Sequence, residues 1–312
     1  MDFITAAQFP ELFDKNVREV VEGVEKELHE EFNTRAMLFT EGSTDRQYEK
    51  YSSVTSSPDI GEWDGALDYL PQYPGYDFTV QPKIYAGATQ YERELFDTKQ
   101  QSVLDDRAKN LARSVYRKLD KIAIEPLSLG FAATNGSMMT SEEGVALFGA
   151  HLNKTGYSTA SGFTNYGTGA LTPANLQTAI INMSYFRTDI GERTYARPDT
   201  LIIPTNLRFR AEEIVGTDKG LYSAEGTKNV LGPSGSGKLK IMEIPRLGDY
   251  DTNNWFLVNE REMKQALLWL WVVKPDYAST VDFETKAFKT SAYTELGWLF
   301  RAWRFGWGSL VS

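Results

Sequence analysis

The chain has 312 residues, a formal net charge of −9 and no cysteine, with 41% hydrophobic and 24% charged residues. This composition is typical of a folded globular protein of about two domains. It excludes disulfides, thiolate metal sites and cysteine nucleophiles, and it argues against a generally basic nucleic-acid-binding protein. The 7 Trp, 16 Tyr and 17 Phe suit an obligate oligomer, although a well-packed monomer would have the same aromatic content.

The sequence predicts neither a membrane span nor export. No apolar run reaches about 18 residues, the length required for a transmembrane helix. The N-terminus, Met1 to Ala7, lacks the basic and apolar regions of a signal peptide. We therefore expect a cytoplasmic chain without a membrane partner, in which the sequons at Asn135, Asn153 and Asn182 are not glycosylated.

Residues 10–32 are predicted to form a helix with Pro10 at its first position. Its apolar residues recur at three- and four-residue spacing: Leu12, Phe13, Val17, Val20, Val21, Val24 and Leu28. The other face is acidic, with Glu19, Glu22, Glu25, Glu27, Glu30 and Glu31. We interpret this as a solvated face; repulsion or contact with a scaffold is the alternative.

Residues 45–97 lack helical periodicity. Residues 45–56 and 76–91 are polar-aromatic extended stretches, and Pro82 restricts the second to a sheet edge or a bulge. Turn-forming Gly and Pro residues lie between them, which predicts a long two-stranded arm with an elaborated tip. Because an isolated hairpin is marginally stable, the arm needs a neighbour. Its candidate inter-subunit residues are Trp63, Tyr69, Tyr73, Tyr76 and Phe78.

Residues 98–124 give the clearest helical pattern. One face is apolar, with Leu104, Ala108, Leu111, Val115, Leu119 and Ile122. Another carries four cations at i, i+4 spacing, here called the basic ladder: Lys109, Arg113, Arg117 and Lys121. Such a ladder is either a solvated face or, in a cavity filled with nucleic acid, a surface that screens phosphates without reading sequence.

Residues 131–272 are predicted to form an α/β region. Thr172 and Pro173 begin a helix whose buried face is Leu176, Ala179, Ile180 and Met183. Residues 200–203 form a buried strand, and Thr205 caps a short helix that Gly216 ends after Val215. Further strands are expected at 239–244, 255–258 and 266–273, and residues 290–307 are extended and rich in aromatic side chains.

One segment, Gly232 to Lys238, matches the phosphate-binding pattern G-x-x-x-x-G-K. That pattern requires Ser or Thr next, whereas this chain has Leu239, and the alternation that follows predicts a strand where a helix is required. We interpret the segment as a flexible turn between strands. A nucleotide-binding enzyme that uses it is the alternative from a different functional class.

The remaining candidates for chemistry are the two histidines. His29 lies on a charged helix face and is interpreted as solvated. His151 precedes a Gly-rich loop and has no acidic cluster near it in the sequence, which leaves metal ligation or general-base catalysis a minor alternative. Neither G-x-S-x-G nor H-E-x-x-H occurs. We predict no catalytic residue, no metal site and no cofactor.

Four segments, in order, resemble the major capsid proteins of tailed phages, especially the Mu-like head-subunit family. They are Val145 to His151, Leu171 to Leu176, Arg197 to Leu207 and the aromatic C-terminus from Tyr293 to Ser309. The motifs are moderately specific and are confined to about residues 145–214 and, more loosely, the C-terminus. The 45–97 hairpin is recognised only by its position and character.

The resemblance implies an α+β, Hong Kong 97-type major capsid fold. It would comprise an N-terminal arm with a helix (1–44), an extended β-hairpin loop (45–97), the spine helix of a peripheral domain (98–130), an axial α/β domain (131–272) and return strands to the peripheral domain (273–312). It also implies a virion subunit that forms hexamers and pentamers around double-stranded DNA.

The expected partners are other copies of the chain and a portal, with a cement protein as an optional further partner. Some members of the family carry an N-terminal scaffolding segment. Because the N-terminal arm of this chain begins almost at Met1, we expect scaffolding to be a separate protein. The alternative of the same fold is an encapsulin-like compartment that encloses protein cargo.

Overall fold

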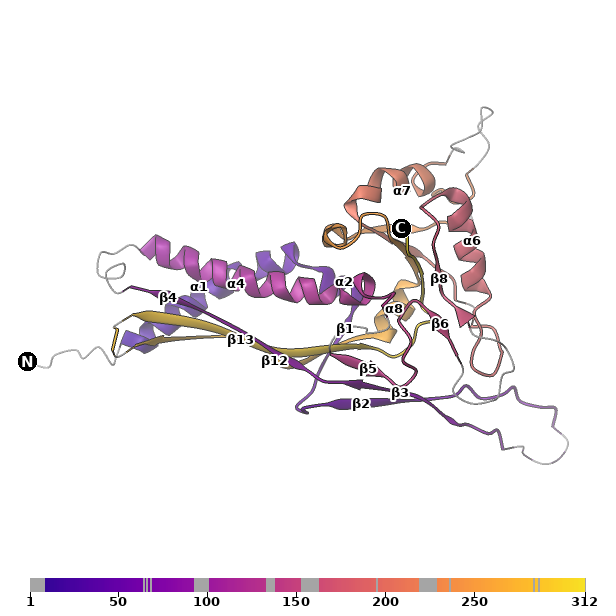
Figure 1. Cartoon of the computed structure of the whole chain (residues 1–312), viewed down its shortest axis with the longest axis horizontal. Coiled ribbons are helices and arrows are strands. Elements are labelled where there is room, and N and C mark those ends of the chain that lie inside the picture. The colour runs from indigo at the N-terminus through magenta and orange to yellow at the C-terminus, as the bar shows by residue number, and fades with distance from the viewer. Residues whose placement is uncertain are drawn as a thin grey trace, which may run out of the picture.

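The computed structural model describes residues 9–63, 65, 67, 69–92, 101–132, 138–152, 163–194, 196–218, 229–235, 237–282, 284–285 and 287–311, and only the backbone of 9–18 and 101–104. The molecule has three parts (Figure 1). The first part, the limb, is long and consists of helices packed on a sheet. The second part, the lobe, contains another sheet with its own helices. The third part, the arm, is thin and projects away from the limb.

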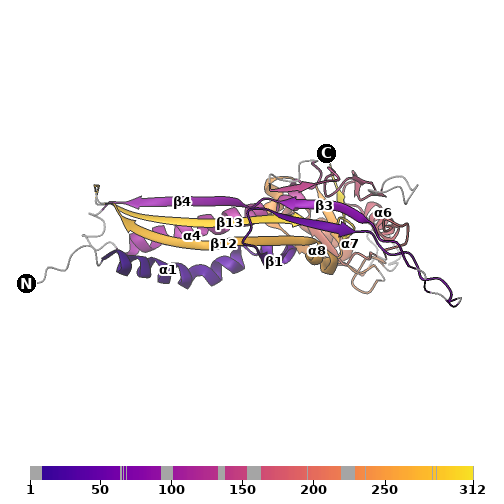
Figure 2. The same cartoon turned by 90° about the horizontal axis from the view of Figure 1, so that it is seen from below.

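The limb consists of two long helices on one face of a four-stranded sheet, as the two views show (Figure 2). Alternate residues of the strands face the helices: Ala292 and Leu296 are buried, whereas Ser291 and Tyr293 on the other face are exposed. The helices are α1 (Phe9–Glu31) and α4 (Gln101–Ala123). The strand order is β1 (Thr40–Ser43), β12 (Leu267–Val281), β13 (Phe288–Phe300) and β4 (Lys83–Tyr91).

Two short helices close the limb near the lobe, α2 (Thr34–Leu38) and α5 (Glu125–Ser128). Arg35 lies over the Trp271 ring at 5.0 Å and pairs with Glu41 at 2.9 Å. Trp271 donates its indole N–H to the same carboxylate. Asp120 of α4 accepts a 2.5 Å hydrogen bond from Arg246 of the lobe, and this bond links the limb to the lobe.

The lobe contains a mixed five-stranded sheet whose central strands are completely buried. Its order is β10 (Lys240–Glu243), β9 (Thr200–Ile203), β11 (Trp255–Val258), β14 (Gly306–Ser309) and β8 (Tyr166–Gly167). Around it lie α6 (Pro173–Ser184), α7 (Arg208–Val215), α8 (Glu260–Ala266) and the 3-10 helices η2 (Thr205–Leu207) and η3 (Pro245–Asp249). A two-stranded sheet joins β6 (Ala150–His151) to β7 (Phe163–Thr164).

The arm begins as a three-stranded sheet of β2 (Glu49–Val54), β3 (Pro74–Val80) and β5 (Met139–Ser141). Beyond Val54 and Pro74 the chain continues outward as the segment that we call the arm tip, residues 55–73 (Figure 1). The predicted isolated two-stranded hairpin is therefore wrong at its base, because β5 adds a third strand there.

Several predicted elements are confirmed. The helices expected at 10–32 and 98–124 are α1 and α4, and the strand at 200–203 is β9. Thr172 caps α6, and its hydroxyl accepts the backbone N–H of Asn175 at 3.2 Å. Among the helices that the structure describes, none combines the length and the apolar character needed to cross a bilayer.

Other predictions are wrong in an informative way. Residues 76–91 form two strands, because the chain breaks at Gln81 and Pro82 and β4 then pairs with β13 in the limb. Thr205 does not cap a helix; its hydroxyl bonds Glu243 at 2.8 Å, and a 3-10 turn precedes α7.

The C-terminal stretch 290–307 was expected to be continuous, and residues 273–312 were expected to return together to one domain. Instead β13 ends at Phe300, and β14 pairs with β11 and β8 in the lobe. Gly308 permits this pairing, since a Cβ there would lie 2.8 Å from Phe131 and from Phe148. The strands of the limb were expected to begin at residue 273, but β12 already begins at Leu267.

Candidate assembly surfaces

Helix α4 separates its apolar and basic residues as predicted. Leu111, Leu119 and Ile122 are buried and Val115 is partly buried, while the side chain of Leu104 lies outside the described residues. All four members of the basic ladder, Lys109, Arg113, Arg117 and Lys121, are exposed. Arg113 pairs with Glu31 of α1 at 3.3 Å, so the acidic face of α1 neutralises part of the ladder within the subunit.

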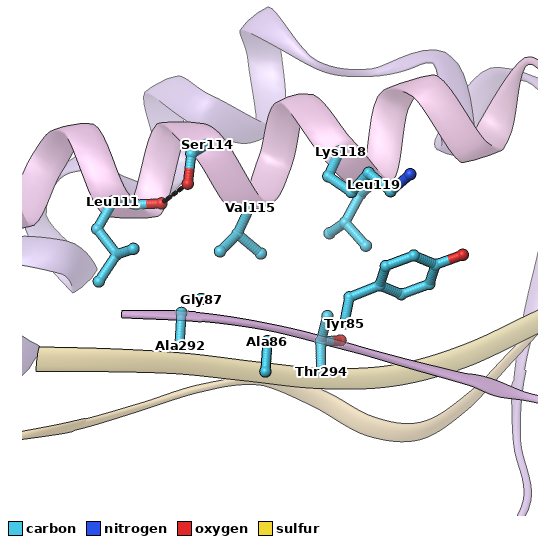
Figure 3. A pocket seen from close by; sticks show the side chains of 10 residues that line it. All are labelled: Tyr85, Ala86, Gly87, Leu111, Ser114, Val115, Lys118, Leu119, Ala292 and Thr294. Carbon is cyan, nitrogen blue, oxygen red and sulfur yellow. Dashed lines mark hydrogen bonds between the residues drawn. The ribbon is translucent and has the colours of Figure 1, made fainter. Parts of the chain in front are cut away.

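Between α4 and the edge strand β4 lies a groove of about 260 Å³ (Figure 3). Leu111, Val115 and Leu119 point from the helix toward β4 and β13, where Ala86 and Ala292 leave space. Lys118 lies over the Tyr85 ring at 4.9 Å. Burial raises the pKa of Tyr85 to about 12, helped by the nearby Glu125 carboxylate, so this phenol is neutral at physiological pH.

The five candidate arm residues do not share one environment. Trp63 and Tyr69 in the arm tip are 67% and 96% exposed. Tyr73 and Tyr76 are half-buried. Phe78 is buried against Phe300, with ring centroids 5.8 Å apart, so its place is the core of its own subunit and not an exposed hairpin surface. The alternation of β3 could have identified Phe78 as inward-facing, but its partner Phe300 is remote in sequence.

The root of the arm is held by charged side chains from distant segments. Asp189 accepts the backbone N–H of Ser56 at 3.2 Å, and Glu142 accepts that of Asp77 at 3.0 Å. Arg301 lies over the Tyr51 ring at 4.3 Å. These contacts fix the direction in which the arm tip leaves the body.

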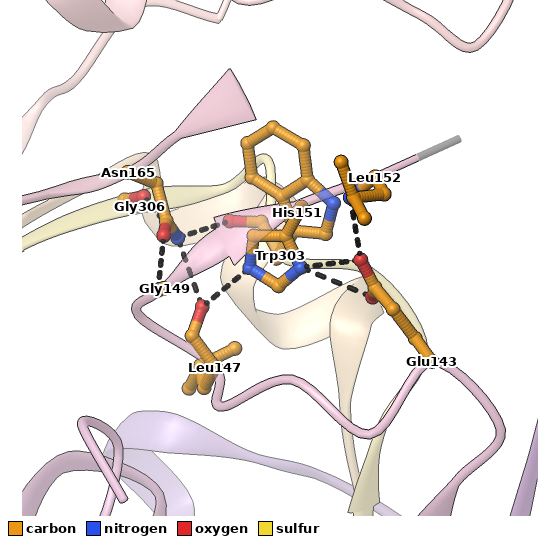
Figure 4. A network of polar contacts seen from close by, with 8 residues as sticks. All are labelled: Glu143, Leu147, Gly149, His151, Leu152, Asn165, Trp303 and Gly306. Carbon is orange, nitrogen blue, oxygen red and sulfur yellow. Dashed lines mark hydrogen bonds and ion pairs between the residues drawn. The ribbon is translucent and has the colours of Figure 1, made fainter. Parts of the chain in front are cut away.

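His151 belongs to a buried polar network (Figure 4). Its ring lies flat on Trp303, with centroids 4.4 Å apart, and Nδ1 is 3.1 Å from the Glu143 carboxylate. The sequence showed no acidic cluster near His151, and the structure brings one carboxylate, that of Glu143, to its ring. Asn165, also fully buried, donates to the Leu147 carbonyl at 2.9 Å and accepts from Gly149 N–H at 2.8 Å. The network joins residues 143–151 and Asn165 to the turn after β13, which is a structural role.

Arg304 extends this network toward the arm root. Its Nε donates to the Arg187 carbonyl at 2.8 Å. Burial lowers the pKa of Arg304 below its usual value, and the charges of Asp189 and Glu143 oppose that shift. An arginine remains charged under this perturbation, so Arg304 supplies a fixed positive charge that interacts with both carboxylates.

His29 is not simply solvated. It lies edge-on against Tyr116, with Nε2 3.2 Å from the phenol oxygen, and Glu25 accepts the phenol O–H at 2.6 Å. This triad joins α1 to α4. Within the described part of the chain, no group of three or more His, Asp or Glu side chains is arranged to hold a metal ion.

The segment Gly232 to Lys238 precedes strand β10 and not a helix. Asp218 accepts the backbone N–H of Ser234 at 2.9 Å, so a carboxylate occupies an amide that a phosphate-binding loop would offer to its ligand. The turn is compact, because a Cβ at Gly235 would lie 1.9 Å from the Val230 carbonyl oxygen. Strand β10 follows the turn as expected, and among the described residues the element before it is helix α7.

A family model described as phage capsid protein matches residues 75–308. The chain belongs to this family. The match begins in β3 and ends in β14, so α1, β2 and the arm tip of this capsid protein lie outside it. No curated protein matches the sequence.

Solved structures with similar folds include chains of several phages. The capsid protein matches a chain of Mycobacterium phage Patience at 10% identity, over 94% of this chain and 88% of that chain, with a TM-score of 0.57. It matches the mature capsid of bacteriophage PhiM1 at 11% identity, over 88% and 85%, with a TM-score of 0.55. The capsid of Myoviridae phage XM1 gives 12% identity, 90% and 91%, and a TM-score of 0.52. The predicted major capsid fold is thus confirmed.

Proposed function

We propose that this capsid protein is the major subunit of an icosahedral phage head of the Mu-like type, and that it assembles into pentamers and hexamers around double-stranded DNA. Its role is structural and not enzymatic. The observation that carries the proposal is the arm, whose tip exposes large apolar side chains far from the subunit's own core. Exposed side chains of this kind mark a surface that another protein covers.

The parts of the structure support the proposed division of labour. The limb serves as the peripheral domain with α4 as its spine helix, the lobe as the axial domain around capsomer centres, and the arm as the extended loop. Assembly occurs in the host cytoplasm with a separate scaffolding protein and a portal, and a cement protein is an optional further partner.

The exposed basic ladder supports contact with the packaged polyanion. Of its members, Lys109, Arg117 and Lys121 supply positive charge beyond the Arg113–Glu31 pair. Such cations neutralise phosphates without reading sequence. We place this face of α4 toward the interior of the shell.

Deletion of residues 60–73 tests the proposal. The subunit should keep its fold, because the deleted residues include none of its most buried side chains, and shell yield measured by electron microscopy should collapse. Obligate interfaces commonly bury about 2,000–5,000 Å², and the deletion removes the exposed apolar side chains Trp63 and Tyr69 that the arm offers to such an interface. A Gly/Ser segment of equal length is the matched control for chain length. Normal shells from both variants would show that the arm is not an assembly element.

A further inference from the structure

We propose that one proton held between His151 and Glu143 locks the direction in which the arm leaves the body, so that the arm root opens as the pH rises. The arm root is defined here as residues 52–56 and 73–77. The inference deepens the proposed function, on which its meaning for assembly rests, because the arm is the proposed assembly element. A buried ion pair, a hinge in the arm and a charged connection between the two carry it.

Both ring nitrogens of His151 face oxygen atoms that accept hydrogen bonds (Figure 4). Nδ1 lies 3.1 Å from each carboxylate oxygen of Glu143, and Nε2 lies 3.2 Å from the Leu147 carbonyl oxygen. A neutral imidazole has one N–H, so it would satisfy one of these partners and turn a lone pair toward the other. The contacts are complete only when a second proton lies between Nδ1 and the Glu143 carboxylate.

Solvent cannot easily replace that proton's hydrogen bond. The side chains of His151 and Glu143 are 1% and 6% exposed. The Trp303 indole covers one face of the imidazole, with ring centroids 4.4 Å apart, and such stacking is stronger for a cationic ring. A buried acceptor that faces a lone pair is destabilising, because no water compensates for it. Loss of the shared proton therefore displaces the imidazole from its place between Glu143 and Leu147.

The sign of the response follows from this geometry. The lock is closed while the pair holds its proton, and it opens as the pH rises through the titration of the pair. Histidine is the side chain that ordinarily changes charge between about pH 5 and 8. A change from mildly acidic to mildly alkaline solution is thus the relevant perturbation.

The arm bends where its strand ladder is irregular. The register of β2 against β3 shifts between Ser52 and Val54, and an irregularity of this kind bends a strand. A cavity of about 160 Å³ lies beside it. Residues 53–56 and 75–76 of the arm line this cavity together with Glu143, Asp189 and Arg304 of the body. Because the cavity separates the arm root from the body, individual polar contacts across it hold the direction of the arm.

Arg304 connects the ion pair to the arm root. Its guanidinium lies over the Trp303 ring at 4.7 Å, and its charge interacts with both Glu143 and Asp189. Asp189 in turn accepts the Ser56 N–H, with both carboxylate oxygens at 3.2 Å. While the pair holds its proton it is neutral as a whole, and Arg304 supports Asp189. Once the proton leaves, the pair carries a net negative charge that draws Arg304 toward it and weakens the Asp189 contact with Ser56.

Hydrogen exchange of the dispersed subunit at about pH 6 and about pH 9, corrected for the intrinsic exchange rates, tests the lock. The peptide that contains Ser56 should lose protection about tenfold at the higher pH, whereas peptides from β13 should not change. In Glu143→Gln the amide donates to Nδ1 and accepts the Leu152 N–H without a titrating proton, so protection should be equal at both pH values. His29→Gln, which removes the other of the two histidines, should keep the wild-type response.

Equal protection of the wild-type arm root at both pH values would overturn the lock. So would a pH response that survives Glu143→Gln or disappears in His29→Gln. If circular dichroism shows that Glu143→Gln does not fold, Asp189→Asn replaces it, because this variant keeps an acceptor for Ser56 but removes the charge that Arg304 meets. A pH response that persists in Asp189→Asn would equally refute the connection.

Shell formation is a separate measurement. Because exchange is measured on the subunit, failure of the wild-type chain to form any shell would refute the proposed function and leave the lock standing. Normal shells from a chain whose arm root shows no pH response would refute the lock and leave the function intact.

Discussion

Two leucines of the limb allow the packing argument to be tested with identical chemistry. Leu38 at the end of α2 is fully buried, whereas Leu111 of α4 is 7% exposed and lines the groove. Replacing either by alanine deletes three carbon atoms, which corresponds to about 2.4 kcal/mol of lost transfer free energy at about 0.8 kcal/mol per carbon. The two sites differ in whether a closed cavity remains.

At Leu38 the surrounding atoms enclose the vacated space, so the cavity term adds to the transfer term and the expected loss is about 3–5 kcal/mol. At Leu111 the vacated space joins an existing groove, so the expected loss is about 2 kcal/mol. The free energy of unfolding should therefore differ between the variants by about 1–3 kcal/mol, although the deleted groups are the same.

Urea unfolding of the dispersed subunit, followed by tryptophan fluorescence, measures this difference. Trp269, Trp271 and Trp298 lie in the limb sheet beneath the helices and report its unfolding. Arg113→Ala is the control on the exposed face, where loss of the Glu31 pair should change stability by less than about 1 kcal/mol. Equal losses for Leu38→Ala and Leu111→Ala would show that the groove does not relieve the cavity cost. A loss below about 0.5 kcal/mol for Leu111→Ala would show that the Leu111 side chain does not contribute to core packing.

Three further predictions concern charge. Arg113→Glu with Arg117→Glu should alter the melting of the free subunit little but lower DNA content per particle or particle yield; if both stay normal, the ladder is only a solvated face. Lys238→Ala should change stability by less than about 0.5 kcal/mol, and labelled ATP should bind neither wild type nor variant; saturable wild-type binding lost on mutation would restore the nucleotide hypothesis. Burial raises the pKa of Glu125, while its hydrogen bond from Trp298 opposes the shift. Its ionised form therefore weakens the folded state as pH rises above the ordinary value of 4.5, and Glu125→Gln should gain stability relative to wild type over that range. A pH-independent difference between the two proteins would contradict this.

Local pattern was enough to predict the elements whose signal lies within one segment. The apolar repeats of 10–32 and 98–124 became α1 and α4, and Thr172 before Pro173 marked the start of α6. The alternation that begins at Leu239 correctly predicted a strand after the Gly232 to Lys238 turn, since β10 follows it. These inferences succeed because helix periodicity, caps and turn chemistry depend on residues a few positions apart.

Which distant segments contact each other was decided only by the tertiary structure. Glu143 meets His151 because Trp303 supplies the surface on which the imidazole stacks. Strand β14 lies in the lobe and not beside β13, and β4 separates from β3 to form the groove with α4. The acidic, aromatic character of the arm tip can be read from sequence alone, whereas the groove exists only where α4 packs on β4. Strand pairing and groove formation depend on which remote surfaces bury the most apolar area together, and no short stretch of sequence contains that comparison.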